Sequence, residues 1–308
     1  MQHFNRRSWA LFLLLAAGMA CGDSATEPDP IPVNEAEVLV SYVEANAGYD
    51  IQGGFVIKAT DVRTNVVTGA NQYVVDIRAA TDYASGHIDG AVNVSFGELQ
   101  NHLAGLSPAA SSYDVIVIAC YSGQTAAYAT GVLRAAGFEN VKSLKWGMSS
   151  WHDDFSGPWV GGRSNARASQ FVTGASPAMN TAGDYPTLNT GFEDGASILE
   201  ARVNTVLAAG FTPAKISNGD LFMDLDGHYI MNFWPPALYE NTGHIPGAID
   251  YDPATTPFKS TTYLKTLPTD QPVVTYCYTG QTSAYITGYL RVLGYDAKTL
   301  LYGANGMI

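Results

Sequence analysis

The chain carries one cysteine-bearing stretch twice. Residues 119–131 read ACYSGQTAAYATG and residues 276–288 read YCYTGQTSAYITG, so that Cys120 and Cys277 stand 157 positions apart (277 − 120). A unit of roughly 110 residues that recurs at this offset is too long for a solenoid repeat and suits a duplicated domain. The sequence therefore predicts two tandem copies of one fold.

Other segments repeat around the two cysteines. SGHIDGAVNV (85–94) matches TGHIPGAIDY (242–251), and VLRAAGF (132–138) matches YLRVLGY (289–295). A linker rich in Gly, Ser, Asn and Thr over 161–190 marks the boundary between the copies. We expect a first domain over 35–160 and a second over 191–308.

Within each copy, short apolar runs alternate with helical patterns. YVVDI, AVNV, DVIVIA and KSLKW are nearly continuous apolar runs, which is typical of strands buried on both faces of a parallel sheet. TAAYATGVLRAAG has apolar residues at helical spacing and ends at Gly137, and residues 37–46 resemble an amphipathic helix. This alternation predicts an α/β fold in which right-handed crossovers connect a parallel sheet.

The N-terminus has the organisation of an export signal. Residues 1–21 combine Arg6 and Arg7, an apolar run from Trp9 to Ala20, and Cys21 directly after small residues. The apolar run is shorter than the roughly 20 residues that span a membrane. The segment resembles a lipoprotein signal peptide in which Cys21 is lipidated, and residues 22–34 are polar enough to form a flexible tether.

These features predict an exported protein on the periplasmic face of a bacterial membrane, held there by an N-terminal lipid. A secreted or soluble periplasmic protein is the alternative if Cys21 is not lipidated. The formal net charge is −12 and no run of Lys or Arg occurs. A nucleic acid partner is therefore not expected, because phosphate binding requires a basic surface.

Each repeated cysteine follows a strand and precedes a glycine-containing loop and a helix. In parallel α/β sheets, ligands bind at the carboxyl ends of the strands, where loop amides and a helix N-terminus stabilise negative charge. A thiolate in this place is stabilised without a basic side chain, so we expect the pKa of both cysteines to be lowered. The loops that would bind substrate comprise Tyr121, Ser122, Gly123, Gln124, Thr125, Tyr278, Thr279, Gly280, Gln281 and Thr282.

The chain contains three cysteines, and lipidation of Cys21 would leave one possible internal pair. A bridge between Cys120 and Cys277 would require two equivalent sheet edges to face each other. We therefore expect two free, reactive thiols rather than a disulfide.

The pattern VDIR…GHIDGAVNV…CYSGQTA…GF…WGM resembles the rhodanese family of sulfurtransferases, and both copies match it. The resemblance implies a roughly five-stranded parallel sheet with helices on both faces in each domain. It implies that Cys120 and Cys277 take sulfane sulfur from thiosulfate or a persulfide, form a cysteine persulfide, and pass the sulfur to cyanide or a thiol. The sequence itself has no CxxC or paired-histidine spacing and no GxxxxGK(S/T) or GxGxxG motif, so no metal and no cofactor are expected.

The chain departs from the family in its charged residues. Neither loop contains the Arg or Lys of many thiosulfate-using relatives, which favours a less charged persulfide donor. YVVDIR (73–78) aligns with LFMDLD (221–226), so Asp76 and Asp224 are expected to support the loops at strand ends. In this alignment Asp226 replaces Arg78, and nine extra residues in an aromatic insertion precede the second histidine motif.

Several alternatives accompany this interpretation. The loops could carry persulfide or bind anions or proteins without turnover. A related phosphatase would need Arg six positions after the cysteine, where Ala126 and Ser283 stand. His87 and His244 fit turn positions better than catalysis, and the inserted residues 233–236 fit local packing better than a lid. The chain ends soon after its last strand, so either the second domain lacks a closing helix or the sequence is truncated.

Overall fold

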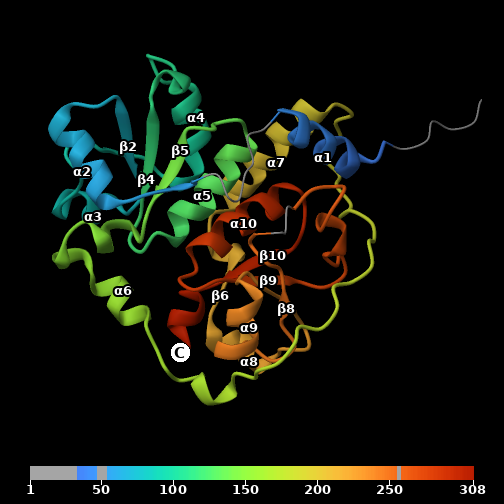
Figure 1. Cartoon of the computed structure of the whole chain (residues 1–308). Helices are drawn as coiled ribbons and strands as arrows, with labels where there is room; N and C mark the ends of the chain where they lie inside the picture. The colour runs from blue at the N-terminus through green and yellow to red at the C-terminus, as the bar shows by residue number, and fades with distance from the viewer. Residues whose placement is uncertain (1–32, 47–53, 255–257) are drawn as a thin grey trace, which may run out of the picture. The chain divides into compact units, whose positions relative to one another are not determined.

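Each of the two copies forms its own five-stranded parallel sheet. The computed structural model describes residues 33–46, 54–254 and 258–308, so the predicted signal peptide and all but the last two residues of the predicted tether lie outside the described residues. The first sheet has the strand order β1-β5-β4-β2-β3 and the second has the equivalent order β6-β10-β9-β7-β8 (Figure 1). All strand pairs in both sheets are parallel, which confirms the predicted α/β fold of two tandem domains.

The strands of the first sheet are β1 (Val56–Ile57), β2 (Gln72–Asp76), β3 (Val92–Asn93), β4 (Val115–Ala119) and β5 (Val141–Leu144). Those of the second are β6 (Lys215–Ile216), β7 (Tyr229–Asn232), β8 (Ile249–Asp250), β9 (Val273–Tyr276) and β10 (Ala297–Leu300). The α-helices are α1 (Glu35–Asn46), α2 (Ala59–Thr68), α3 (Ala80–Ser85), α4 (Leu99–Ala104), α5 (Gln124–Ala135), α6 (Gly157–Gly162), α7 (Gly195–Ala209), α8 (Asn218–Met223), α9 (Pro236–Thr242) and α10 (Gln281–Val292). No helix in these described ranges is long and apolar enough to cross a membrane.

The strand register corrects one part of the repeat alignment. β2 places Asp76 opposite Ala119 at the end of β4, and β7 places Asn232 opposite Tyr276 at the end of β9. Asn232 is therefore the counterpart of Asp76. The prediction that Asp224 supports the loop from a strand end is wrong.

Asp224 instead terminates helix α8. The Ser217 side chain accepts a hydrogen bond from the amide of Asp220 and caps the start of this helix, which turns the apolar run LFM into helix rather than strand. Asp224 is exposed, and its Oδ1 accepts a hydrogen bond from the amide of Gly227 at 3.1 Å. The segment assigned to an insertion contains the true strand β7.

The corrected register also changes the second domain's counterpart of Arg78. Arg78 lies two residues after Asp76, and Trp234 lies two residues after Asn232, so Trp234 and not Asp226 occupies this place. The separation from the strand end to the following histidine is then 11 positions in the first domain (87 − 76) and 12 in the second (244 − 232). One extra residue replaces the predicted insertion of nine.

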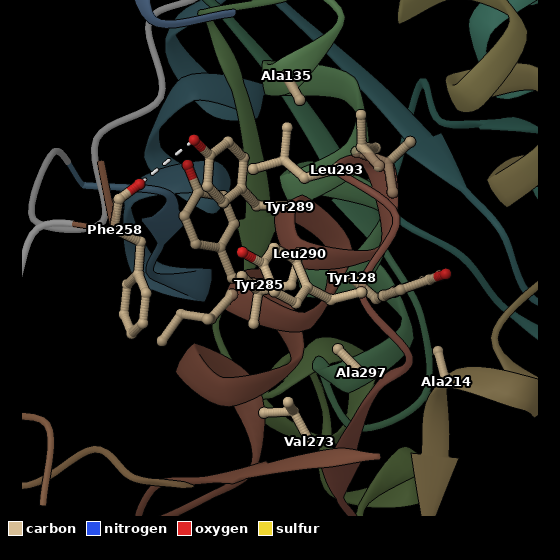
Figure 2. Close-up of a cluster of buried hydrophobic side chains, with 14 of the residues drawn as sticks. Tyr128, Ala135, Ala214, Phe258, Val273, Tyr285, Tyr289, Leu290, Leu293 and Ala297 are labelled. Carbon is tan, nitrogen blue, oxygen red and sulfur yellow. Dashed lines mark hydrogen bonds between the residues drawn. The ribbon is translucent and has the colours of Figure 1, made fainter. Parts of the chain in front are cut away.

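A hydrophobic core is shared between the domains. It joins residues of α5 in the first domain to residues of α7, α10 and the second sheet, and Figure 2 shows part of it around Tyr128, Tyr285 and Leu290. Helices α5 and α10 lie side by side at its centre (Figure 1). They cross at Gly131 and Gly288, where a Cβ on Gly131 would stand 2.2 Å from the carbonyl oxygen of Tyr285. Only glycine permits this approach.

The segment between the domains packs along the surface of the second domain. The amide of Ser164 donates to the carbonyl oxygen of Asn305 at 3.0 Å. Further along, Val172 and His244 exchange two backbone hydrogen bonds of 3.0 and 2.8 Å. At the other end of the chain, helix α1 packs against α7. Both connections add contacts between the two halves of the described chain.

Candidate active site

Cys120 lies in a cradle of backbone amides at the carboxyl end of the central strand β4. Gly123 has a φ of +88°, which suits glycine and turns the chain into helix α5. This turn directs the amides of Gly123 and Ala126 at Cys120 Sγ, with N···S distances of 3.2 and 3.3 Å. The side chain is only 1% exposed. The amides thus converge on the cysteine in the way that the sequence predicts for this position.

Burial and the loop amides act in opposite directions on the Cys120 thiol. Burial raises the pKa of Cys120, whereas the amides of Ala126, Gly123, Ser122 and Thr125 lower it, and burial has the larger effect. The predicted lowering of the pKa is therefore wrong for Cys120 in the described structure. The cost of removing a thiolate from water exceeds the stabilisation that these amides provide.

Cys277 occupies the equivalent place in the second domain, with a hydroxyl added to its surroundings. Gly280 has a φ of +77° and starts helix α10. The amide of Ser283 lies 3.4 Å from Cys277 Sγ, and the thiol donates to Ser283 Oγ at 3.6 Å. Ser283 Oγ also shares a hydrogen bond of 2.8 Å with Thr299 Oγ1. The first domain has Ala126 at this position, so the two sites differ chemically.

Both cysteines are free, as the sequence predicts, and both are buried, which it does not predict. In each domain, a turn after the last strand fixes the cysteine loop from behind. In the first domain, the amides of Met148 and Ser149 donate to the carbonyl oxygens of Cys120 and Tyr121 at 2.8 and 3.0 Å. A Cβ on Gly147 would stand 2.4 Å from the Cys120 carbonyl oxygen, so this turn also requires glycine.

The second domain repeats this arrangement. The amides of Ala304 and Asn305 donate to the carbonyl oxygens of Cys277 and Tyr278, both at 2.9 Å. A Cβ on Gly303 would again collide with the carbonyl oxygen of the cysteine. Gly147 and Gly303 thus take equivalent positions in the two domains, each in the turn that holds the backbone of the cysteine loop.

The residues beside the first cysteine loop form a buried ion pair under an exposed ring. Arg78 binds Asp76 through Nε and Nη2, with Nη2···Oδ2 at 2.7 Å, and Nη2 also donates to the carbonyl oxygen of Gly86. Tyr121 is 37% exposed, and its hydroxyl donates to Asp82. The Arg78 guanidinium lies 6.0 Å from the centre of the Tyr121 ring. The Arg78 guanidinium is thus bound by Asp76 and lies beside the Tyr121 ring.

The second site replaces this ion pair with aromatic packing. Tyr278 is 42% exposed and stacks on Trp234 with 4.9 Å between ring centroids. Trp234 is itself buried and also packs edge-on against Tyr276. Local packing of Trp234 and its buried neighbour Phe233 is therefore confirmed.

The remaining loop residues divide by orientation. Ser122 is buried and accepts a hydrogen bond from Gln124 Nε2 at 3.2 Å. Three loop threonines are half-buried: Thr125, Thr279 and Thr282. The side chains of Gln124 and Gln281 reach residues of the opposite domain, which the sequence analysis did not anticipate.

The two histidines take part in turns. His87 stacks on Tyr83, and its Nδ1 lies 2.9 Å from the Tyr83 carbonyl oxygen. His244 makes the same contacts with Tyr239, again with 2.9 Å to the carbonyl oxygen. These contacts agree with the interpretation that both histidines position turns.

The sequence profile of the Rhodanese-like domain matches the chain twice, over residues 58–154 and 214–307. The chain belongs to the rhodanese-like family. The matched segments contain both cysteine loops, the two turns that hold these loops, and the central strands of both sheets.

Curated relatives of these rhodanese-like domains include named sulfurtransferases. The chain is 36% identical over 80 residues to "Thiosulfate sulfurtransferase GlpE" of Shewanella oneidensis, covering 26% of this chain and 75% of the relative. It is 30% identical over 78 residues to "Putative sulfur carrier protein YrkF" of Bacillus subtilis, covering 25% of this chain and 40% of that protein. Among solved structures, a thiosulfate sulfurtransferase from Pseudomonas aeruginosa aligns with 89% of this chain and 47% of its own, at 17% identity and a TM-score of 0.32.

Besides the contacts of the two glutamines, sequence reasoning missed two features of the rhodanese-like sites. Position 283 was considered only as the place where a phosphatase would have arginine, so the Ser283 hydroxyl beside Cys277 was missed. A serine six positions after a loop cysteine falls in the first turn of the helix, and this signal could have revealed it. Asn232 was missed because LFMDLD was read as strand. The motif Ser217-x-x-Asp220, a helix-capping signal, could have revealed the error.

Proposed function

We propose that the chain is a sulfurtransferase in which Cys120 and Cys277 each carry sulfane sulfur as a persulfide. The observation that supports this most directly is the convergence of loop amides on Cys120 Sγ at the N-terminus of helix α5. Such amides stabilise a thiolate and the persulfide anion that replaces it. The names of the curated relatives support the same class of reaction.

The proposed reaction has two displacement steps. The cysteine thiolate attacks the outer sulfur of thiosulfate, the S–S bond of the donor breaks with its electron pair, and sulfite leaves while Cys–S–S⁻ forms. Cyanide then attacks the outer sulfur of the persulfide, which releases thiocyanate and restores the thiolate. Charge balances in both steps, and no cofactor takes part.

The charge around the loops favours a donor with less negative charge than thiosulfate. Residues 121–125 and 278–282 contain no Lys or Arg, and Arg78 is already bound to Asp76 and Gly86. From these loops, a thiosulfate dianion would receive only amides and hydroxyls to balance its charge. We therefore propose a persulfide or polysulfide as the better donor, with a higher kcat/KM than thiosulfate.

A second candidate is a sulfur relay without efficient turnover. It is favoured by the burial of Cys120 and by the raised pKa that results, because a thiol that stays protonated is a slow nucleophile. In this role the loops would receive sulfur from a protein donor and deliver it to a protein acceptor.

One experiment separates these candidates. The chain is incubated with thiosulfate or glutathione persulfide, and its intact mass is followed before and after cyanide is added. The enzyme gains one sulfur per reactive cysteine and produces thiocyanate over many turnovers, whereas the relay loads sulfur without turnover. Full activity in the double variant Cys120→Ser, Cys277→Ser would disprove the site assignment.

We also propose that a lipid on Cys21 holds the two domains at the periplasmic face of a bacterial membrane. This rests on the composition of residues 1–34, of which 1–32 lie outside the described residues. Incorporation of labelled palmitate in the native chain, and its loss in Cys21→Ala with release from the membrane fraction, tests the proposal. Equal membrane association of both forms would contradict it.

A further inference from the structure

Each domain sends one glutamine side chain into the other domain. Gln281, the first residue of α10, donates from Nε2 to Ser143 Oγ at 2.9 Å and to the carbonyl oxygen of Leu144 at 3.0 Å. Its Oε1 accepts a hydrogen bond from the amide of Trp146 at 3.0 Å. Gln281 is only 4% exposed, so water is not available to replace these contacts. All three partners belong to the end of β5 and the turn that follows it.

These contacts place the Gln281 side chain next to the amide cradle of Cys120. Gln281 Nε2 lies 2.8 Å from the position that a Cβ on Gly123 would take. Gly123 is the residue whose amide points at Cys120 Sγ, and Ser143 Oγ donates to its carbonyl oxygen at 3.3 Å. The side chain of Gln281 therefore lies against the residue that shapes the first cysteine loop.

The second domain receives the reciprocal contact. Gln124, the first residue of α5, accepts a hydrogen bond at Oε1 from the amide of Tyr302 at 2.7 Å. The same Oε1 lies 2.6 Å from the position of a Cβ on Gly280. Tyr302 precedes the turn at 303–305 that holds the carbonyl oxygens of the Cys277 loop.

The two amides that the glutamines bind belong to residues with the same unusual backbone conformation. Trp146 and Tyr302 both have a left-handed backbone, with φ of 60° and 61°. Both amides are partly buried, and an amide that loses contact with water is stabilised by an acceptor in the protein. The glutamine of the opposite domain supplies that acceptor in both cases.

We propose that Gln124 and Gln281 are positioning residues, each of which reaches into the opposite domain. Each sets the geometry of the amide cradle around the cysteine of that domain. The meaning of this inference for catalysis rests on the proposed sulfur transfer, but the geometry can be tested without it. The two cysteine loops then form a coupled pair, because the residue that starts the helix after one loop supports the turn behind the other.

The first test measures thiol reactivity, which does not depend on sulfur transfer. Gln281→Met keeps the volume of the side chain and removes its hydrogen bonds, and Gln271→Met is the matched control at a glutamine that bonds only to Asp226 in the described contacts. Cys120 and Cys277 are alkylated with iodoacetamide between pH 7 and 10.5 and quantified by peptide mass spectrometry. We expect Gln281→Met to slow alkylation of Cys120 about threefold at pH 8 and to shift its profile to higher pH, the effect of one misaligned hydrogen bond.

The proposal is decided by which of the two cysteines is alkylated more slowly in Gln281→Met. A role within its own loop would make Gln281→Met act mainly on Cys277, four residues away, and that result would overturn the proposal. Faster alkylation of both thiols, which indicates a loosened fold, would also overturn it, as would a profile equal to that of Gln271→Met.

The second test asks how the exchange affects turnover. In the Cys277→Ser chain, where Cys120 is the remaining loop thiol, Gln281→Met should lower kcat at least about threefold with little change in KM. In the Cys120→Ser chain the same substitution should have a smaller effect. If no variant produces thiocyanate, the proposed function fails, while the alkylation result still decides the role of the glutamines.

Discussion

Asp250 allows a prediction about stability that can be worked out from its surroundings. It ends strand β8, where its Oδ1 is buried and has no hydrogen-bond partner among the described residues. Burial, followed by the charges of Asp252 and Glu240, raises the pKa of Asp250 to about 6 from an ordinary value of 3.8. The folded chain therefore retains a proton between pH 4 and 6 that the unfolded chain has lost.

The sign and size of the effect follow from this difference. A raised carboxyl pKa gives stability that is present below about pH 4 and is lost as the pH rises through about 6. The shift corresponds to at most about 3 kcal/mol, since one pKa unit is about 1.4 kcal/mol. Asp250 is only half-buried, so solvent screening reduces this to about 1–2 kcal/mol.

The first domain shows what should relieve this cost. The register places Asn93 at the position of Asp250, and Asn93 Nδ2 donates to the carbonyl oxygens of Asp76 and Arg78, both at 2.9 Å. We expect Asp250→Asn to stabilise the chain by about 1–2 kcal/mol at pH 7 and to have little effect at pH 4. Urea unfolding of both forms from pH 4 to 8 measures the difference. A stability difference that is constant over this range would refute the reasoning.

Three further predictions concern the cysteines and the contact between the domains. Gly131→Ala should destabilise the chain by about 1–3 kcal/mol, measured by urea unfolding, because its Cβ would stand 2.2 Å from the Tyr285 carbonyl oxygen and force the helices apart. Ser283→Ala, which removes the hydroxyl beside Cys277, should slow sulfur loading of that thiol about threefold to tenfold, measured for each cysteine by peptide mass spectrometry. Since burial raises the pKa of Cys120, its alkylation rate should rise about tenfold per pH unit through neutrality and level off only above the usual range for cysteine.

Each of these predictions has a control and a contradicting outcome. Gly161→Ala places a methyl group where no heavy atom lies within 4 Å, and it should leave the urea midpoint unchanged. For Ser283→Ala, loading of Cys120 in the same chain is the internal reference, and equal slowing of both thiols would point to a general disturbance. A plateau in the Cys120 alkylation rate below pH 8 would mean that the loop amides outweigh burial after all.

The fold could be predicted from the sequence because each local signal occurs twice, once in each copy. The strands before Cys120 and Cys277 are apolar on both faces, and the glycine and helix after each cysteine recur at one spacing. These are local signals, so they survive without knowledge of the tertiary structure. The alignment failed only where the copies diverge, at LFMDLD, where helix capping by Ser217 overrides an apolar run that looks like strand.

Features of the site that depend on distant contacts could not be predicted. Nothing in the composition of the loop indicates that burial outweighs four amides at Cys120, because the balance depends on the whole packed surroundings. The placement of Gln281 beside Gly123 likewise depends on how the two domains dock, and no local pattern reports that geometry. Such contacts become visible only when both sheets are in place.

The core that joins α5, α7 and α10 limits how far the two domains can be separated. Tyr128 and Leu290 belong to this core and are fully buried where the two domains meet. Cutting the chain at its linker would now expose this apolar seam to water. Neither domain is therefore expected to be stable alone, because each covers apolar residues of the other.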